Sequence, residues 1–441
     1  MIGDVVGRSR RSGEETFRAA VRSRWEGAFC ALALLYVSGA VGACVAHPEL
    51  RPRAARLFDV AAGAPALLVL FVLAWRQRRL MDLRRDGCLL CLLLMALSST
   101  LWSVSIATSL LGGLRLCAVT VLAVYVARRF ALHDTLRVVI AALAGMLLIS
   151  EVFVLVRPSL GAMALPVGPS AWRGVFHDKN ALGWVAALSL VSGTFGLFVT
   201  RLRRWAACLL LLALPALVLS RSAGALLTVG GALGVTMAIA LRQRLRSTPS
   251  RIAWWGVALV LAALLGSTAG SRLLIRLLNR DMTLTTRAEI WMATLPWVLE
   301  RPWLGHGYHA FWLVAQRPVR ERLLVTPDDV LPVDYPGHAH NGLLETAGDL
   351  GGVGVLLLGV VITVGTVRAL CYAGDSAISY WPLAVVVATV LHDLVETSFL
   401  QTSGAAGVGW IVFLIAVSGA AAGRSAAGGL PLNTSEHVAA T

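Results

Sequence analysis

Long apolar segments separated by short polar ones run through almost the whole chain. A helix of about 17–25 apolar residues can cross the hydrocarbon core of a bilayer, which is about 30 Å thick. By that measure the pattern predicts about twelve membrane-spanning helices: 27–46, 59–75, 87–103, 106–127, 135–156, 181–200, 205–219, 222–241, 252–269, 350–370, 379–397 and 404–422. The fold class that follows is an all-α polytopic membrane protein.

One polar stretch, 270–349, is much longer than the others. Residues 287–300 place apolar side chains at helical spacing, and the Arg301-Pro302 pair ends that helix. Residues 305–308 (Gly-His-Gly-Tyr) predict a turn, and a second short helix is expected from Phe311 to Leu324. Four tryptophans suit amphipathic helices at a membrane surface, namely Trp291, Trp297, Trp303 and Trp312.

The expected organisation has five parts. They are a basic N-terminus (1–26), nine membrane helices (27–269), the long loop with its short amphipathic helices (270–349), three more membrane helices (350–422) and a disordered tail (423–441).

Composition and charge agree with a membrane protein. Only 14% of the residues are charged, against about 25% in soluble domains, and the mean hydropathy is +0.74. The net charge of +15 is concentrated in alternate loops, which fall on one side of the membrane if the helices alternate. By the positive-inside rule that side is cytoplasmic and holds both termini. The charge therefore sets topology, and no nucleic-acid partner is expected.

Four polar clusters then fall together on the opposite face, where the long loop also lies. None of them was used to set the orientation, so their coincidence predicts a shared site. The clusters are His177-Asp178-Lys179-Asn180, Ser220-Arg221-Ser222, Arg287 with Glu289, and His338-Ala339-His340-Asn341.

The side chains in these clusters suit binding of an anion and transfer of a proton. Arg221 and Arg287 can hold phosphate oxygens bidentately, although Arg221 could instead snorkel to headgroups and Arg287 could be a solvated charge. His340 can accept a proton near neutral pH, or it could cap the following helix. His338, two residues earlier, is expected to point elsewhere.

Other polar residues extend this picture. Lys179, the single lysine, could hold a phosphate or a sugar hydroxyl beside Asn180, or anchor at the interface. One face of the predicted helix 379–397 carries His392, Asp393 and Glu396, and polar groups at membrane depth usually face the bundle interior or a water-filled cavity.

Neither a metal nor another cofactor is predicted. A set of His338, His340 and Asp334 matches no standard zinc spacing, and no nucleotide-binding motif occurs. Any chemistry must then be driven by a leaving group on the substrate itself, such as a lipid pyrophosphate.

Four ordered motifs resemble one family. They are 174–183 (GVFHDKNALG), 287–291 (RAEIW), 301–307 (RPWLGHG) and 338–345 (HAHNGLLE). Together they are similar to the O-antigen ligase and polymerase superfamily of bacterial envelopes, including its exopolysaccharide-polymerase branch, with a GT-C-like fold. One departure is that family members often carry an arginine at the position of Ala223, whereas here Arg221 lies two residues earlier.

The resemblance implies transfer of a glycan from undecaprenyl pyrophosphate to a sugar hydroxyl, with inversion and without metal, at the periplasmic face of the inner membrane. The acceptor would be lipid A core for a ligase or a lipid-linked repeat for a polymerase, and other envelope polysaccharide assembly proteins are candidate partners. The rival interpretation from another class is a transporter or flippase, since buried charges could serve a substrate path.

The resemblance also implies roles for individual residues. Arg287, together with Arg221 or Lys179, would stabilise the pyrophosphate, and His340 would accept the acceptor's proton. The groups around the substrate would be positioned by Asn180, His338, Asn341 and Glu345.

Overall fold

The computed structural model of the chain describes residues 24–45, 83–165, 169–244, 283–324 and 338–427. The predicted spans 59–75 and 252–269 lie outside these residues, as do 270–282 and 325–337 of the long polar segment and residues 1–23 and 428–441.

The N-terminal part of the described chain is helical with short breaks. Its elements are the helical residues 24–37, α2 (Ala40–Val45), α4 (Leu83–Ser98), the 3-10 helix η1 (Ser99–Leu101), α5 (Ile106–Arg129), α6 (Leu132–Val156) and α7 (Pro158–Gly161). The two-residue strands β1 (Ala162–Met163) and β2 (Ala171–Trp172) then pair antiparallel.

The remaining elements follow the predicted order closely. They are α8 (Lys179–Gly196), α9 (Arg203–Ser220), α10 (Ala223–Arg244), α13 (Thr283–Glu300), α14 (Phe311–Leu324), α15 (Gly342–Tyr372), η2 (Ala377–Tyr380), α16 (Trp381–Asp393) and α17 (Gly404–Ala427).

Six of these helices are long and apolar enough to cross a membrane, as expected of a multi-pass membrane protein. Their spans are 106–129, 132–156, 203–220, 223–243, 342–372 and 404–421, and a shorter apolar helix covers 377–393. The all-helical class of membrane protein predicted from the apolar pattern is therefore supported, while the number of twelve spans stays a prediction.

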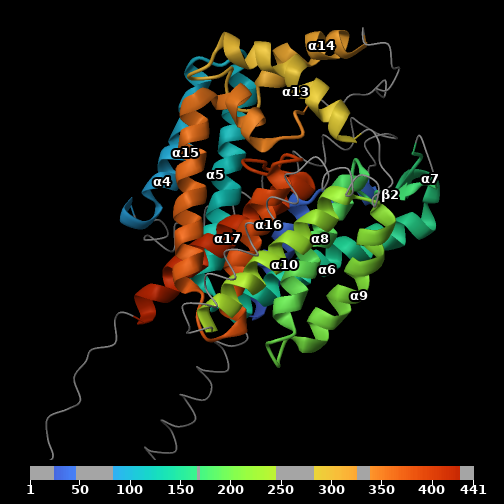
Figure 1. The fold of residues 1–441 in the computed structure, drawn as a ribbon, viewed down its shortest axis with the longest axis vertical. Coiled ribbons are helices and arrows are strands. Elements are labelled where there is room, and N and C mark those ends of the chain that lie inside the picture. The colour runs from blue at the N-terminus through green and yellow to red at the C-terminus, as the bar shows by residue number, and fades with distance from the viewer. Residues whose placement is uncertain (1–23, 46–82, 166–168, 245–282, 325–337, 428–441) are drawn as a thin grey trace, which may run out of the picture.

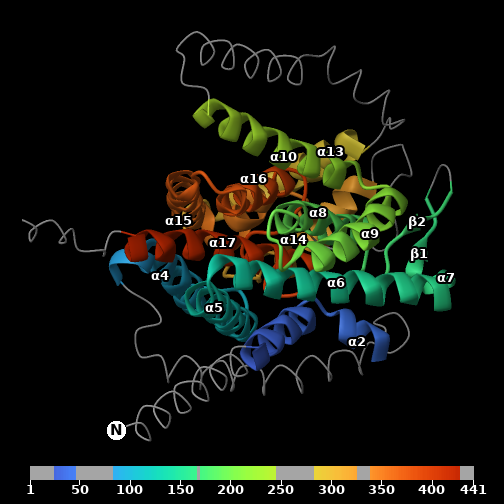
Figure 2. The same cartoon turned by 90° about the horizontal axis from the view of Figure 1, so that it is seen from below.

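The helices form a bundle with two short helices across one end. Figure 1 shows α13 and α14 lying over the upper end of α5 and α15, and we call this the α13–α14 end. Seen from below, α17 runs through the middle of the bundle (Figure 2), where it packs against α5, α8, α15 and α16. The two short helices expected in this part of the polar segment are present, with the first ending at Glu300 and the second covering 311–324. Their place at a membrane surface stays a prediction.

Helix α15 differs from the predicted span. It begins at Gly342 instead of residue 350, and it is interrupted at Gly351, whose φ is 66° and ψ is −167°. The loop after α13 docks into this break: the N–H of Gly352 donates to the Pro302 carbonyl at 2.7 Å and that of Val353 to the Trp303 carbonyl at 3.2 Å. The end of the predicted loop, 342–349, is thus helix, and the loop carrying the 301–307 motif supplies the hydrogen bonds that the break leaves open.

Replacing Gly351 with alanine should destabilise the protein by at least about 1–3 kcal/mol, because its backbone conformation is open essentially to glycine alone. A Cβ there would also lie 2.3 Å from the Trp303 carbonyl. Gly359 in the same helix offers a matched control, since a Cβ at that position meets nothing within 4 Å. Thermal unfolding in detergent should show Gly351→Ala well below Gly359→Ala, and equal unfolding temperatures would contradict this account of the break.

Three other helices also differ from the prediction, one by an internal break and two at their C-terminal ends. The N-terminal span 27–46 is interrupted at Gly39, which has a φ of 71°, and α17 continues to Ala427 past the expected start of the tail. Helix α16 ends at Asp393 because the Asp393 carboxylate accepts the N–H groups of Ser398 and Phe399, at 2.6 and 2.9 Å, and so holds the chain in a turn. Glu396 therefore lies in that turn, beyond the helix.

Candidate functional site

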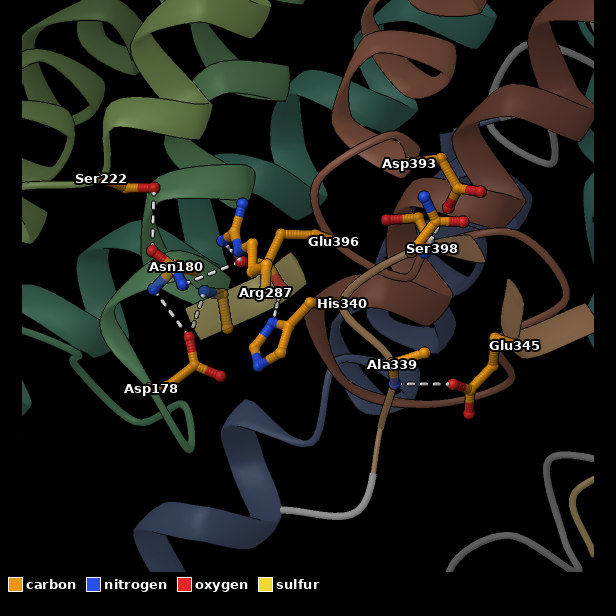
Figure 3. Close-up of polar contacts among 12 residues, drawn as sticks. Asp178, Asn180, Ser222, Arg287, Ala339, His340, Glu345, Asp393, Glu396 and Ser398 are labelled. Atoms are coloured by element: carbon orange, nitrogen blue, oxygen red, sulfur yellow. Dashed lines mark hydrogen bonds and ion pairs between the residues drawn. The ribbon is translucent and has the colours of Figure 1, made fainter. Parts of the chain in front are cut away.

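A single buried carboxylate, Glu396, joins three side chains at the α13–α14 end of the bundle (Figure 3). Its Oε1 accepts from the Asn180 amide at 2.8 Å and from an Arg287 guanidinium nitrogen at 2.6 Å. Its Oε2 lies 2.8 Å from Nδ1 of His340. We call these four residues, with Ser222, the Glu396 network.

Each of the four predicted polar clusters contributes one residue to this network. Asn180 comes from the start of α8, Arg287 from α13 and His340 from the segment before α15. From the second cluster the contributor is Ser222, whose hydroxyl donates to the Asn180 side-chain oxygen at 3.1 Å. The structure therefore brings together segments that are far apart in the sequence, as their predicted common face implied.

The start of α8 fixes the direction of the Asn180 amide. Asp178 caps this helix, because its Oδ1 accepts the N–H groups of Asn180 and Ala181 at 2.7 and 2.9 Å. With Ser222 donating to its oxygen, the Asn180 amide presents its NH₂ group to Glu396. Lys179 is the first residue of the same helix and is half-buried.

His340 is held in a conformation that directs one ring nitrogen at Glu396. Its φ is +48°, in the left-handed region that few residues other than glycine and asparagine adopt. Because Nδ1 faces a carboxylate, the hydrogen bond assigns the proton of the neutral ring to Nδ1 and leaves a lone pair on Nε2. The alternative that His340 caps the following helix is wrong: Asn341 is the cap, and its side chain accepts the Leu344 N–H at 3.0 Å.

The network keeps Glu396 ionised. Burial alone would raise the pKa of its carboxyl, but the hydrogen bond from His340, together with the charge of Arg287, outweighs burial and lowers the pKa to about 2. The side chains of Arg287 and Glu396 are 16% and 12% exposed, so this ion pair is largely shielded from solvent. Glu396 is thus an anion at any pH near neutral.

Hydrogen bonds hold both backbone groups of Ala339, the residue between the two histidines. The N–H of Ala339 donates to Glu345 Oε2 at 2.9 Å, and its carbonyl accepts from the indole of Trp291 at 2.8 Å. The other oxygen of Glu345 accepts from the indole of Trp312 at 2.8 Å. Both oxygens of Glu345 are therefore used by the protein, which favours a positioning role over the predicted contact with substrate. The indoles of Trp291 and Trp312 thus hold the site in place, and the expectation that the four tryptophans lie at the membrane surface stays a prediction.

His338 lies beside His340, contrary to the expectation that it points elsewhere. The two ring centroids are 3.9 Å apart at an interplanar angle of 64°. Alternate residues of an extended segment point to the same side, so the expectation was mistaken. Burial, followed by the nearby His340, lowers the pKa of His338 to about 3. His338 is therefore neutral near pH 7 and adds no charge to the site.

The ring nitrogens of His338 and His340 and a Glu396 oxygen lie within 4.8 Å of one another, close enough to hold a metal ion. The chemistry of the set argues against one. Both Glu396 oxygens already accept hydrogen bonds, and the Arg287 cation at 2.6 Å would repel a divalent ion. Asp334, the third residue of the metal set considered in the sequence, lies outside the described residues.

The remaining predicted anion binder is less closely tied to the network. Arg221 occupies the left-handed turn between α9 and α10, with a φ of 51°, and its side chain is exposed. Its neighbour Ser222 makes the contact to Asn180. A role for Arg221 toward an anion stays a prediction, as does the role of Lys179.

Comparison with known proteins gives this arrangement a family context. Residues 206–359 match the family model of O-antigen ligase. The chain is also 25% identical over 269 residues to the exopolysaccharide production protein ExoQ of Rhizobium meliloti (strain 1021). That alignment covers 59% of this chain, and the chain spans about 60% of the length of this curated relative. The resemblance to the O-antigen ligase and polymerase superfamily is confirmed.

The O-antigen ligase match contains part of the network. Ser222, Arg287 and His340 lie inside residues 206–359, whereas Asn180 and Glu396 lie outside. Glu396 was absent from the predicted site, although its type and place gave a signal: it is a carboxylate in an otherwise apolar segment, near His392 and Asp393. The sequence could show that such a group faces the interior, but not which residues it meets.

Proposed function

We propose that this protein transfers a glycan from a polyprenyl pyrophosphate carrier to a sugar hydroxyl, as an O-antigen ligase or an exopolysaccharide polymerase. The observation that carries the proposal is the meeting of Arg287, His340 and Asn180 at Glu396. The O-antigen ligase match and the similarity to ExoQ support the same chemistry. In this proposal the site faces the periplasm and the chain lies in the inner membrane.

The reaction is a direct displacement at the anomeric carbon of the donor. The acceptor oxygen forms a bond to that carbon as the bond to the pyrophosphate oxygen breaks, and the pyrophosphate leaves with the electron pair. Nε2 of His340 takes the proton of the acceptor hydroxyl, since Nδ1 is committed to Glu396. The Glu396 carboxylate holds the ring in this tautomer and stabilises the imidazolium that forms, as the carboxylate of a catalytic triad does.

Arg287 is the proposed ligand for the leaving group. A guanidinium has five N–H donors, and the bond to Glu396 engages one terminal nitrogen. The other N–H groups can bind phosphate oxygens and stabilise the charge that develops as the pyrophosphate departs. Lys179 and Arg221 are proposed as further cations, because Arg287 and Glu396 neutralise each other and a pyrophosphate adds negative charge.

The first experiment compares surface and lipid-linked glycans, separated on gels, from cells with and without this protein. Polymer of full length that stays on the lipid carrier would indicate a ligase. Single repeats without long chains would indicate a polymerase. Unchanged glycans, in cells that make them and lack a redundant enzyme, would refute transfer, and repeats trapped on the cytoplasmic leaflet would favour the transporter.

The clamp on Ala339 gives a prediction about a residue outside the reacting groups. Trp291→Phe keeps a ring but removes the indole N–H that holds the Ala339 carbonyl. A lost hydrogen bond of this kind is worth about 0.5–1.5 kcal/mol, so we expect kcat to fall by about 2- to 10-fold, with little change in the KM for the donor. Trp297→Phe, on the same helix, is the control and should retain both constants. If the two variants behave alike in a membrane assay, Trp291 has no positioning role.

A further inference from the structure

A cavity of about 330 Å³ opens beside the Glu396 network. This volume lies at the lower end of the range for small-molecule sites, about 300–1,000 Å³. Its wall runs from Asn180 and Glu396 past Trp312 and His309 to the first turn of α17 at Ala405. The proposed mechanism uses only one side of this cavity and leaves the rest of its wall without a role.

Besides the indole nitrogen of Trp184, three polar atoms on this wall have no hydrogen-bond partner among the described residues. These three are Nε2 of His309, Nδ1 of His392 and the hydroxyl oxygen of Thr397, and all of them are buried. A buried polar group without a partner costs about 1–3 kcal/mol. Three such groups on one cavity wall therefore indicate that something with hydrogen-bonding groups fills the cavity.

Other contacts hold the His392 ring and the backbone that carries His309 and Thr397. The His392 ring stacks on Trp184 with centroids 3.9 Å apart and an interplanar angle of 3°. The backbone N–H of His309 donates to Asp349 at 2.9 Å. Thr397 follows Glu396 directly, within the turn that Asp393 stabilises. The unpartnered atoms are thus presented by a fixed wall.

These atoms are also uncharged. Burial, and then the charge of Arg115, lowers the pKa of His309 to about 4, so its imidazole is neutral near pH 7. The acidic groups on the same wall already have donors: Glu345 accepts from Ala339 and Trp312, and Asp349 accepts from His309 and Phe311. The described residues that line this part of the cavity include no lysine or arginine, so a pyrophosphate is better placed at Arg287.

We infer that this neutral wall, formed by His309, His392 and Thr397, binds a sugar ring through its hydroxyl groups, next to His340. Hydroxyls both donate and accept, so one ring can satisfy imidazole nitrogens and a threonine hydroxyl together. The half-buried indole of Trp312 adds an apolar surface to the same cavity. This inference rests on the proposed function, because it identifies the subsite that supplies the glycan to the reacting centre.

Two substitutions remove the proposed contacts with little change of shape. Thr397→Val replaces the hydroxyl by a methyl group, and His392→Phe keeps an aromatic ring for the stack on Trp184. Thr389→Val is the matched control, since the Thr389 hydroxyl donates to the Val385 carbonyl within α16 and does not line the cavity. Thermal unfolding of the three variants should show that they fold.

Binding is measured on the full chain in nanodiscs with two separate probes. One is the free oligosaccharide repeat, released by mild acid from the producing cell's own surface polysaccharide; the other is undecaprenyl pyrophosphate without sugar. Thr397→Val and His392→Phe should each weaken binding of the oligosaccharide by about 3- to 10-fold. Binding of undecaprenyl pyrophosphate should change less than about twofold, and Thr389→Val should match the wild type with both probes.

The outcomes separate the inference from the proposed function. Oligosaccharide binding that is absent in the wild type, or equal in wild type and folded variants, would overturn the sugar subsite even if glycan transfer is intact. Selective loss of oligosaccharide binding in a protein that makes no product would support the subsite and refute the transferase. Equal loss of both probes would also overturn the inference, because it would show that the cavity wall supports the whole site instead of one ligand.

Discussion

Replacing His340 with asparagine should lower glycan transfer by about 10²- to 10⁴-fold, the range expected when a general base is removed. Asparagine suits this position because it tolerates the left-handed conformation that His340 adopts at a φ of +48°. Its side-chain NH₂ group can also replace Nδ1–H as the donor to Glu396. What the variant lacks is Nε2, so the loss of activity should occur without loss of the fold.

The measurement is the rate of product formation in membranes that contain equal amounts of each variant. His133→Asn provides the control, because His133 is exposed near the start of α6 and pairs with Asp134 at 3.2 Å. That variant should transfer glycan at the wild-type rate. If His340→Asn retains more than about a tenth of that rate, His340 is not the base and the proposed displacement needs another proton acceptor.

The fold followed from the sequence wherever one physical rule controls an element. Helix α14 begins and ends at the predicted residues because its apolar side chains recur at helical spacing and pack on α13. Helix α15 was misjudged because its first turns carry Glu345 and Asp349, which read as part of a polar loop. Both carboxylates are buried and bonded to α14 or the loop before it. Such tertiary pairing is invisible to a hydropathy pattern.

The sequence predicted where the candidate site lies better than it predicted which of its residues contact one another. The alternation of basic loops placed the four polar clusters on one face, and the structure gathers one residue from each around Glu396. Which member of a cluster points inward depends on local backbone geometry that spacing does not reveal. In the second cluster the contact comes from Ser222, while Arg221 occupies the turn. In the fourth, the ring of His338 lies alongside that of His340.

The second large effect is expected for Glu396→Gln. The change leaves the Arg287 cation, only 16% exposed, without its counter-ion. Breaking one side of a buried ion pair typically costs about 3–5 kcal/mol. Glycan transfer should also fall by at least about 10²-fold, because a neutral amide can no longer fix the His340 tautomer or stabilise its imidazolium. Unfolding in detergent and product formation in membranes measure the two effects separately.

The same carboxylate gives a pH dependence whose sign is fixed by its pKa. The folded pKa of about 2 lies below the ordinary value of 4.5, so the unfolded chain binds the proton more tightly. The stabilisation by Glu396 is therefore fully present above about pH 4.5 and is lost as the pH falls from about 4.5 to 2. Other groups also titrate in acid, so the test is the difference in unfolding temperature between wild type and Glu396→Gln. That difference should shrink in this window, and a constant difference would contradict the ionised network.

A double substitution separates the structural part of Glu396 from its part in the reaction. Arg287→Met alone leaves the Glu396 carboxylate without its cation, while Arg287→Met with Glu396→Gln removes both charges at once. Because contacting residues do not contribute additively, the double variant should be clearly more stable than the sum of the single losses predicts. Its glycan transfer should nonetheless stay as low as that of either single variant, since both the pyrophosphate ligand and the histidine's partner are gone. Recovery of transfer along with stability would mean that the Arg287–Glu396 pair only holds the fold together.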